Sequence, residues 1–206
     1  MKEILRDVET YFADKVKTHG ATPEGVDFTG VNAQIIRFEQ LLKVIDGDEV
    51  FSINDYGSGY GALAEFLTTR WSDFTYCGFD ISEAMRSHGE ALYADDIRVR
   101  FVANYTDLSA ADYTVASGVF NIKLGFDSAM WQEHVIEEIE HMAAVSVKGF
   151  AFNMLTSYSD PERMRGDLYY GDPLFFFDHC KRSYSRNVAL LHDYNGFDFT
   201  IIVRLQ

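Results

Sequence analysis

A stretch with three alternate glycines, Asp55-Tyr56-Gly57-Ser58-Gly59-Tyr60-Gly61, constrains this chain more than any other feature. An apolar run with Phe51 and Ile53 leads into it, and a helix-forming run from Ala62 to Thr69 follows it. Glycine tolerates backbone angles that other residues resist and lets a ligand approach the main chain. The start of a helix offers unpaired N–H groups and the positive end of its dipole. The stretch therefore predicts a buried strand, a tight turn and a helix, with bare amides facing a carboxylate or phosphate.

Two classes of cofactor site use such a turn. Dinucleotide-binding enzymes use G-x-G-x-x-G/A, which Gly57, Gly59 and Ala62 satisfy. S-adenosylmethionine (SAM) methyltransferases use acid-x-G-x-G-x-G, which Asp55, Gly57, Gly59 and Gly61 satisfy in full. The Tyr-x-x-x-Lys pair of short-chain dehydrogenases occurs only upstream of the turn, at Tyr11 and Lys15. That order favours SAM over a nicotinamide-dependent oxidoreductase, which stays open as an alternative, as does a glycine turn without a ligand.

Strands and helices are expected to alternate from residue 50 onward. Short apolar, β-branched or aromatic runs predict strands at about 50–55, 74–79, 97–102, 112–117 and 147–154. Helical spacing predicts helices at about 3–18, 31–45, 60–70, 82–93, 129–145 and 173–184. This alternation indicates an α/β, doubly wound and mostly parallel sheet covered on both faces.

The C-terminal end departs from the alternation. Val188–Leu191 and Phe197–Val203 are apolar runs separated by a short turn that contains Asn195-Gly196, which is a hairpin signal. With this C-terminal antiparallel hairpin the sheet has seven strands. Over about residues 30–206 the chain resembles the class I SAM-dependent methyltransferases of the small-molecule type, a Rossmann-like fold in which the last strand is antiparallel to its neighbours.

The resemblance assigns a part of the cofactor to each loop. It implies that Asp55 lies near the methionine part of SAM, with the backbone at Gly57, Gly59 and Gly61 against it. Asp80 ends the next predicted strand, 25 residues after Asp55, which suits an acid that accepts hydrogen bonds from the ribose diol. The alternatives are a turn or N-cap role for Asp55 and an N-cap role for Asp80.

Further cofactor contacts are implied on the same edge of the sheet. Ile81 would lie under the adenine, and Asn104 would take the place of an acid that contacts the adenine amino group in many relatives. The backbone at Ser117 and Gly118 would lie next to the sulfonium and the methyl group that is transferred. Gln34 and Arg37 share one helix face, from which an arginine could pair with the SAM carboxylate; a solvated polar face is the other interpretation. The remaining site residues expected in these roles are therefore Gln34, Arg37, Ile81, Asn104, Ser117 and Gly118.

Residues for the methyl acceptor are less defined by the pattern. Aromatic side chains near the expected cleft offer flat faces and hydroxyls, and His192 begins a polar cluster at the hairpin. The candidates are Trp131, Tyr169, Tyr170 and His192, with core packing or a polar turn as the alternative for each. No catalytic residue is assigned, because the sulfonium is already an activated leaving group and positioning alone accelerates transfer.

Composition restricts the remaining possibilities. The 206 residues fit a single domain, 1–206, with 1–46 as an N-terminal helical cap. A net charge of −14, from 18 basic and 32 acidic residues, argues against a nucleic-acid substrate and favours a small-molecule acceptor. The absence of a signal-peptide core, of a long apolar run and of paired cysteine spacing predicts a cytoplasmic protein without a membrane span, with Cys77 and Cys180 reduced and buried. His134 and His141, seven apart, are a poor metal pair, so no metal is expected.

The reaction expected from the resemblance is transfer of the SAM methyl to an O, N or C atom of a small molecule, with S-adenosylhomocysteine as product. A protein of this fold that binds SAM without catalysis is a further alternative. The acceptor and the oligomeric state are not defined by the sequence.

Overall fold

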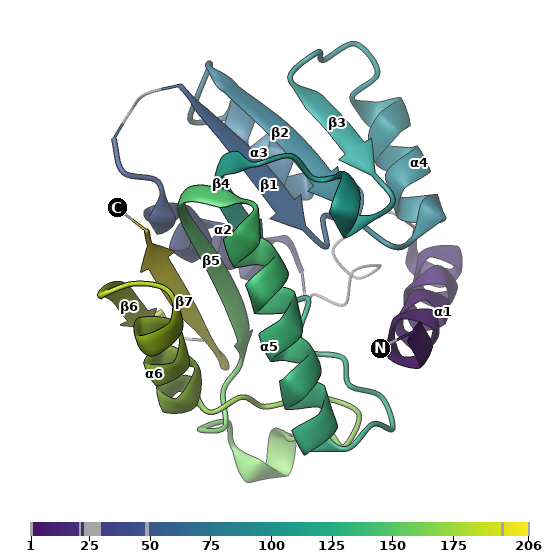
Figure 1. Ribbon diagram of the computed structural model, residues 1–206. Helices are drawn as coiled ribbons and strands as arrows, with labels where there is room; N and C mark the ends of the chain where they lie inside the picture. Colours follow the sequence, from purple (N-terminus) through teal and green to yellow (C-terminus); the bar gives the residue numbers. More distant parts are fainter. Residues whose placement is uncertain (1, 21, 23–29, 48–49, 195, 206) are drawn as a thin grey trace.

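The computed structural model describes residues 2–20, 22, 30–47, 50–194 and 196–205. Its centre is one seven-stranded sheet in the order β3-β2-β1-β4-β5-β7-β6 (Figure 1). The first five strands are parallel, and β7 is antiparallel to both β5 and β6. The strands, in chain order, are β1 (Phe51–Tyr56), β2 (Phe74–Phe79), β3 (Val99–Val102), β4 (Ala111–Ala116), β5 (Ser146–Leu155), β6 (Asn187–Leu191) and β7 (Asp198–Arg204).

The helices connect the strands and flank the sheet. They are α1 (Lys2–His19), α2 (Val31–Leu41), α3 (Ala62–Thr68), α4 (Glu83–Leu92), α5 (Ser128–Ala144) and α6 (Pro173–Ser183), with 3-10 turns η2 (Leu42–Val44), η3 (Tyr105–Asp107) and η4 (Pro161–Arg163). Every expected strand and helix is confirmed, with ends that differ by about two residues; the helix expected at 31–45 finishes as η2. The segment between the helices expected at 3–18 and 31–45 lies largely outside the described residues, as does Asn195 of the hairpin turn.

Side-chain caps explain where three of the helices begin. The Ser82 hydroxyl accepts from the Met85 N–H at 3.4 Å at the start of α4. Asp127 accepts from the Ala129 N–H at 2.8 Å at the start of α5. Asp172 accepts from the Leu174 N–H at 2.8 Å, and Pro173, whose fixed φ suits a first helical turn, follows it as the first residue of α6.

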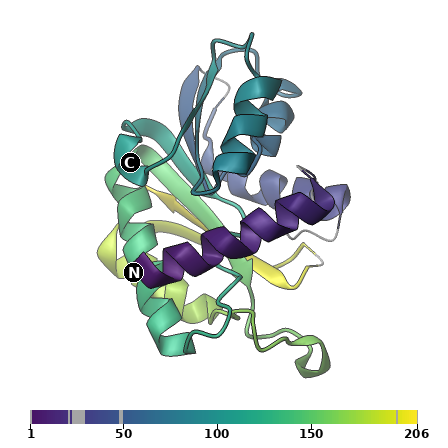
Figure 2. The same cartoon turned by 90° about the vertical axis from the view of Figure 1, so that its right-hand side faces the viewer.

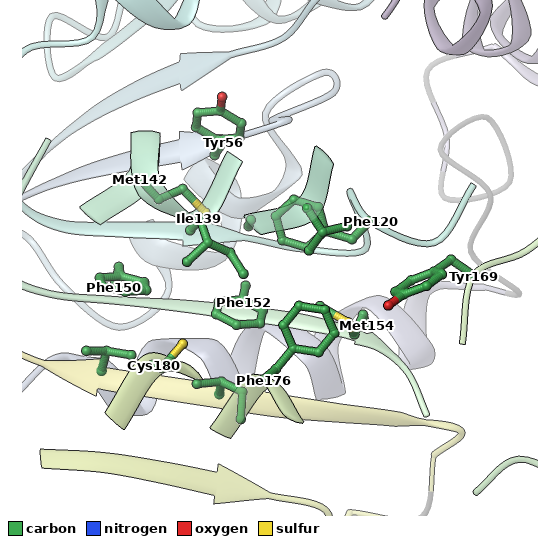
Figure 3. Close-up of a cluster of buried hydrophobic side chains, with 14 of the residues drawn as sticks. Tyr56, Phe120, Ile139, Met142, Phe150, Phe152, Met154, Tyr169, Phe176 and Cys180 are labelled. Carbon is green, nitrogen blue, oxygen red and sulfur yellow. The ribbon is translucent and has the colours of Figure 1, made fainter. Parts of the chain in front are cut away.

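Two hydrophobic cores lie on opposite faces of the sheet. On one face α5 and α6 contribute Ile139, Met142, Phe176 and Cys180, which pack with Phe150 and Phe152 of β5 among other side chains (Figure 3). On the other face α2 and α3 pack with the sheet, through Phe38, Leu41, Leu63, Leu67, Ile53 and Tyr113. Cys77 and Cys180 are free and buried, as expected. Within the described ranges no helix is long and apolar enough to span a bilayer.

The topology determines where a ligand can bind. The chain moves from β1 outward to β2 and β3, then returns to β4 on the other side of β1. Ligands of open α/β sheets bind at the carboxyl ends of the strands where the order reverses, and here that position is between β1 and β4. Figure 2 shows α1 crossing one side of the molecule, in front of α5 and beside α4.

Candidate cofactor site

A cleft lies at the carboxyl ends of β1, β2 and β4, with about 750 Å³ of space out to its open mouth. That volume is within the range of roughly 300–1,000 Å³ typical of small-molecule sites. Helix α1 closes one side with Val8 and Phe12, and α2 contributes Phe38. Of the eleven residues expected to hold a cofactor, eight line this cleft: Gln34, Asp55, Gly57, Gly59, Asp80, Ile81, Ser117 and Gly118.

The glycine turn is bonded to the protein itself. The N–H groups of Gly57 and Ser58 donate to the Phe79 carbonyl at 2.8 and 2.9 Å, and Gly59 N–H donates to Oδ2 of Asp80 at 2.8 Å. Gly61 N–H donates to the Ser58 carbonyl at 3.0 Å. The expectation that the turn leaves its amides bare is therefore wrong at these four positions, because the turn curls back onto the end of β2.

The glycines are instead required by backbone conformation and by close packing. Gly57, Gly59 and Gly61 have φ of 78°, 55° and 86°, in the region that favours glycine. A Cβ at Gly57 would lie 2.5 Å from Cγ2 of Val119, in the segment after β4. Gly61 is the N-cap of α3 and does not line the cleft.

Asp55 presents a buried carboxylate to the cleft. It lies in the buried run near the end of β1 with 3 % of its surface exposed, and its Oδ2 accepts from the Tyr76 hydroxyl at 2.7 Å. Burial raises the pKa of Asp55 to about 7, against the lowering effect of the Tyr76 hydrogen bond and with a further increase from the nearby Asp80 carboxylate. The charge of this group is therefore sensitive to pH near neutrality.

Asp80 is fixed by two backbone donors. Its Oδ2 accepts from Gly59 N–H and its Oδ1 accepts from Ser82 N–H, both at 2.8 Å. Burial raises the pKa of Asp80, although these bonds and Arg86 oppose the increase. The N-cap of α4 is Ser82 and not Asp80, so the carboxylate forms a turn that joins the glycine loop to α4 while it faces the cleft.

Of the two residues expected from α2 at the cofactor, Gln34 and Arg37, only Gln34 lines the cleft. Gln34 is buried and lines the cleft. Arg37 does not line it; its guanidinium donates to Oδ2 of Asp198 at 2.5 Å and to the Ala33 carbonyl at 2.9 Å. The structure thus gives Arg37 a protein carboxylate as partner at the start of β7, in place of the cofactor carboxylate that the sequence predicted.

Arg37→Met should lower the free energy of unfolding by about 3 kcal/mol, because it leaves the Asp198 carboxylate buried without its ion-pair partner. Asp198 is 3 % exposed, and burial already raises its pKa against the effect of Arg37. Urea denaturation at pH 7 measures the loss. Arg70→Met is the matched control, since it removes a half-exposed pair to Glu39 at 2.6 Å and should cost below about 1 kcal/mol. Equal losses in the two variants would contradict a structural role for Arg37.

Asn104 and the four acceptor candidates do not reach the cleft. Asn104 is exposed, and its amide donates to Asp107 at 3.0 Å. Trp131 is buried and donates from Nε1 to the Phe120 carbonyl, and Tyr169 is buried with its hydroxyl on Gln132. The Tyr170 hydroxyl accepts from Arg165 N–H, and His192 is exposed beside Tyr158. Trp131 and Tyr169 therefore pack in the hydrophobic core, which was the alternative to a role in acceptor binding.

The sequence pattern did not point to a second cavity beside the cleft, which is mostly apolar and has a buried polar edge at His134 and Glu138. Tyr56 of β1 donates its hydroxyl to Glu138 of α5, and Nδ1 of His134 lies 3.4 Å from Oε1 of the same carboxylate. Glu138 lies between the two histidines of α5, four residues after His134 and three before His141, and this spacing is the sequence signal for the polar cluster. Among the described residues no set of three or more His, Cys, Asp or Glu side chains could hold a metal ion.

Several solved structures with a similar arrangement are methyltransferases. The DhpI complex with S-adenosylhomocysteine superposes with a TM-score of 0.64, at 15% identity, over 99% of this chain and 98% of the other. Magnesium protoporphyrin IX methyltransferase from Synechocystis PCC 6803, with bound SAM, gives 0.58 at 14% identity over 84% and 79%. These similarities establish the fold.

The chain belongs to the class I SAM-dependent methyltransferases. A Mycobacterium tuberculosis (strain ATCC 25618 / H37Rv) protein named "Putative methyltransferase Rv1506c" is 43% identical over 163 residues, which are 79% of this chain and 98% of that relative. No family model matches the chain.

Proposed function

We propose that this protein transfers the methyl group of SAM to an O, N or C atom of a small-molecule acceptor. The observation that carries the proposal is a cleft that brings together Gln34, the two carboxylates of Asp55 and Asp80, and the glycine turn. The cofactor supplies a methyl group on a sulfonium, which is an activated leaving group. The contribution of the chain is to hold and align two reactants and to exclude water, which can be worth roughly 7–11 kcal/mol.

The residues of the cleft suit the chemical groups of SAM. Asp55 and Gln34 would face the amino-acid end, where an ammonium needs an acceptor, and Asp80 would accept from the ribose diol. Ser117 supports a contact at the sulfur end: its Oγ is buried at the cleft and has no hydrogen-bond partner among the described residues. Gly118 N–H donates to Asn153 at 2.7 Å, which holds this segment in place.

The same hydrogen bonds count against a nicotinamide dinucleotide. A pyrophosphate in a glycine turn needs free backbone amides. Here the amides of Gly57, Ser58, Gly59 and Gly61 are already bonded within the protein, and two carboxylates line the cleft. Titration calorimetry with S-adenosylhomocysteine and with NAD tests this choice. Binding of S-adenosylhomocysteine alone is expected, and binding of NAD alone would overturn the proposal.

Several features extend the proposal beyond the cofactor. The net charge of −14 supports a small molecule over nucleic acid as acceptor. Two buried free thiols suit the reducing cytoplasm.

We also propose that residues 1–206 act as one domain with 1–46 as a helical cap, supported by Val8, Phe12 and Gln34 at the cleft. Turnover of SAM with a panel of acceptors separates an enzyme from a protein that only binds SAM.

Asp80→Ala should weaken the binding of S-adenosylhomocysteine at least tenfold. The substitution removes both the acceptor for the ribose diol and the carboxylate that accepts hydrogen bonds from Gly59 N–H and Ser82 N–H. Asp80→Asn keeps one acceptor oxygen and should lose less. Calorimetry measures both affinities, and thermal unfolding establishes that each variant is folded. Asp107→Ala, at an exposed acid outside the cleft, is the control with an expected change below about twofold. Unchanged affinity in a folded Asp80→Ala protein would remove the ribose role.

A further inference from the structure

One face of β1, β2 and β3 lacks a helix of its own. Helices α3 and α4 join these strands over one face of the sheet, and α5 packs on the other face (Figure 1). A right-handed return from β3 to β4 runs over the face of α5. That return is the short segment 103–110, all of it described, and its regular structure is limited to the 3-10 turn η3. The helical cover expected on both faces is therefore incomplete beside α5.

The side chains of this uncovered face are polar, although parallel strands are usually apolar on both faces. Successive side chains of a strand point to opposite faces, and in β1–β3 the apolar set points toward α3 and α4. The register places Arg100, Cys77 and Asn54 side by side across the three strands. The polar set lines a groove with about 640 Å³ of space out to its open mouth, and its members are Ser52, Asn54, Thr75, Arg98 and Arg100.

The groove contains an arginine that the protein does not pair. Arg98 forms an ion pair with Asp96 at 2.6 Å, and Asp112 beside the groove is paired with Lys148 at 3.2 Å. Arg100 is exposed and makes no hydrogen bond or ion pair with any described residue. The chain as a whole carries a net charge of −14, so this unpaired cation stands out from an acidic surface. A carboxylate from outside the chain is the group that suits it.

Helix α5 carries the complementary charge on the same face of the sheet. Glu133, Glu137 and Glu140 are exposed and follow one another at four- and three-residue spacing, so they form one stripe along the helix. In the part of the chain that the structure describes, none of the three makes a hydrogen bond or an ion pair. Like charges at these spacings repel one another, and a cation from another molecule relieves that repulsion. A helix is about 10 Å thick with its side chains, so α5 rises above the uncovered strands next to it.

We propose that two copies of this chain associate about a two-fold axis, with the acidic stripe of α5 of each copy in the groove of the other. An axis parallel to the strands, between β1 and β4, exchanges helix and groove and keeps every group at its level along the strands. Arg100 lies in one row of the register with Phe150, near the middle of β5. Helix α5 runs back along the sheet from the end of β4 to the start of β5, so Glu137, near its middle, comes to that level.

The resulting interface contains the same contact twice, since Arg100 of each copy meets Glu137 of the other, with Glu140 beside it. Neither Arg100 nor Glu137 lines the cofactor cleft, which opens at the carboxyl ends of the strands. The inference is therefore independent of the proposed function.

Sedimentation equilibrium tests the association. Wild-type protein should form a dimer with a dissociation constant below about 100 µM at low salt, and a weaker one at high salt because salt screens exposed charges. Arg100→Glu and Glu137→Arg should each weaken the dimer at least about tenfold, since each places like charges opposite one another at both contacts. Glu90→Arg makes the same charge change at an exposed acid of α4 and should leave the dimer unchanged.

A one-to-one mixture of Arg100→Glu and Glu137→Arg protein should recover the association that each variant alone has lost. In the mixed pair both contacts again join an acidic and a basic side chain, which happens only if helix and groove are exchanged between copies. Thermal unfolding establishes that each variant is folded, as the exposure of both positions predicts.

The outcomes are distinct from those that test the cofactor. Wild-type protein that stays monomeric overturns the inference and leaves the groove to a small anion or to an acidic segment of another protein. A dimer that neither substitution weakens uses another face, and folded variants that stay monomeric when mixed do not exchange their helices; either result overturns the inference. Calorimetry with S-adenosylhomocysteine should give the same affinity in both variants as in wild-type protein, so failure of the proposed function appears in that measurement alone.

Discussion

Asp55→Asn should lower the affinity for S-adenosylhomocysteine at pH 8 by about thirtyfold or more and, at the same time, make the ligand-free protein more stable. The binding loss follows because an amide keeps the shape and the Tyr76 hydrogen bond but removes the charge that would pair with the ligand's ammonium. The gain in stability follows because the native carboxylate is buried at a cost when it is ionised. A group at a functional site can thus weaken the fold that holds it.

The sign of the stability effect comes from the pKa of about 7, which is raised from an ordinary 3.8. A raised pKa means that the contribution of Asp55 to stability is present below about pH 4 and is lost as the pH rises through 7. At about 1.4 kcal/mol per pKa unit, the unfolding free energy of the variant should rise by at most roughly 4 kcal/mol at pH 8. The rise is smaller than this because the variant loses the hydrogen bond from the Tyr76 hydroxyl to a charged carboxylate.

Calorimetry and urea unfolding between pH 5.5 and about 8.5 measure both effects. Wild-type affinity should rise through neutrality as Asp55 ionises, and the variant should be nearly flat over the same range. Asp107→Asn, at an exposed carboxyl group, provides the control. A variant that binds like wild type, or that is less stable at pH 8, would show that the Asp55 charge does not serve the ligand.

Gly57→Ala should reduce cofactor affinity at least about fiftyfold and cost about 2–3 kcal/mol of unfolding free energy. The added Cβ meets two penalties: a φ of 78° and a contact of 2.5 Å with Cγ2 of Val119. Movement of either segment shifts the glycine turn relative to the loop after β4, and both line the cleft. The same two measurements, calorimetry and urea unfolding, report the result.

Two further variants separate strain from collision. Gly47 also has a positive φ, 95°, but a Cβ added there would meet no atom within 4 Å, so Gly47→Ala should cost only about 1 kcal/mol and leave affinity unchanged. Val119→Ala in the Gly57→Ala background removes the clashing methyl groups and should recover part of the affinity. If Gly47→Ala and Gly57→Ala behave alike, backbone strain alone explains the requirement for glycine.

The sequence predicted the fold well because its signals are local. Periodic apolar residues located the strands and helices, and the acid at the end of each of the first two strands located Asp55 and Asp80 at the cleft. Partner choice is not local. Arg37 meets Asp198 across 161 residues and Tyr56 meets Glu138 across 82, so no spacing rule indicated either pair. The aromatic residues Trp131 and Tyr169 failed as acceptor candidates because an aromatic core and an aromatic pocket have the same composition.

The hydrogen bonds from the glycine turn to Phe79 and Asp80 also affect what binding costs. Ordering a flexible loop around a ligand costs about 1–2 kcal/mol of entropy for each residue whose backbone becomes fixed. In this protein the turn is already fastened to its neighbouring strand before any ligand arrives. Recognition can therefore proceed with little conformational rearrangement of that segment, and most of the contact energy remains available for affinity.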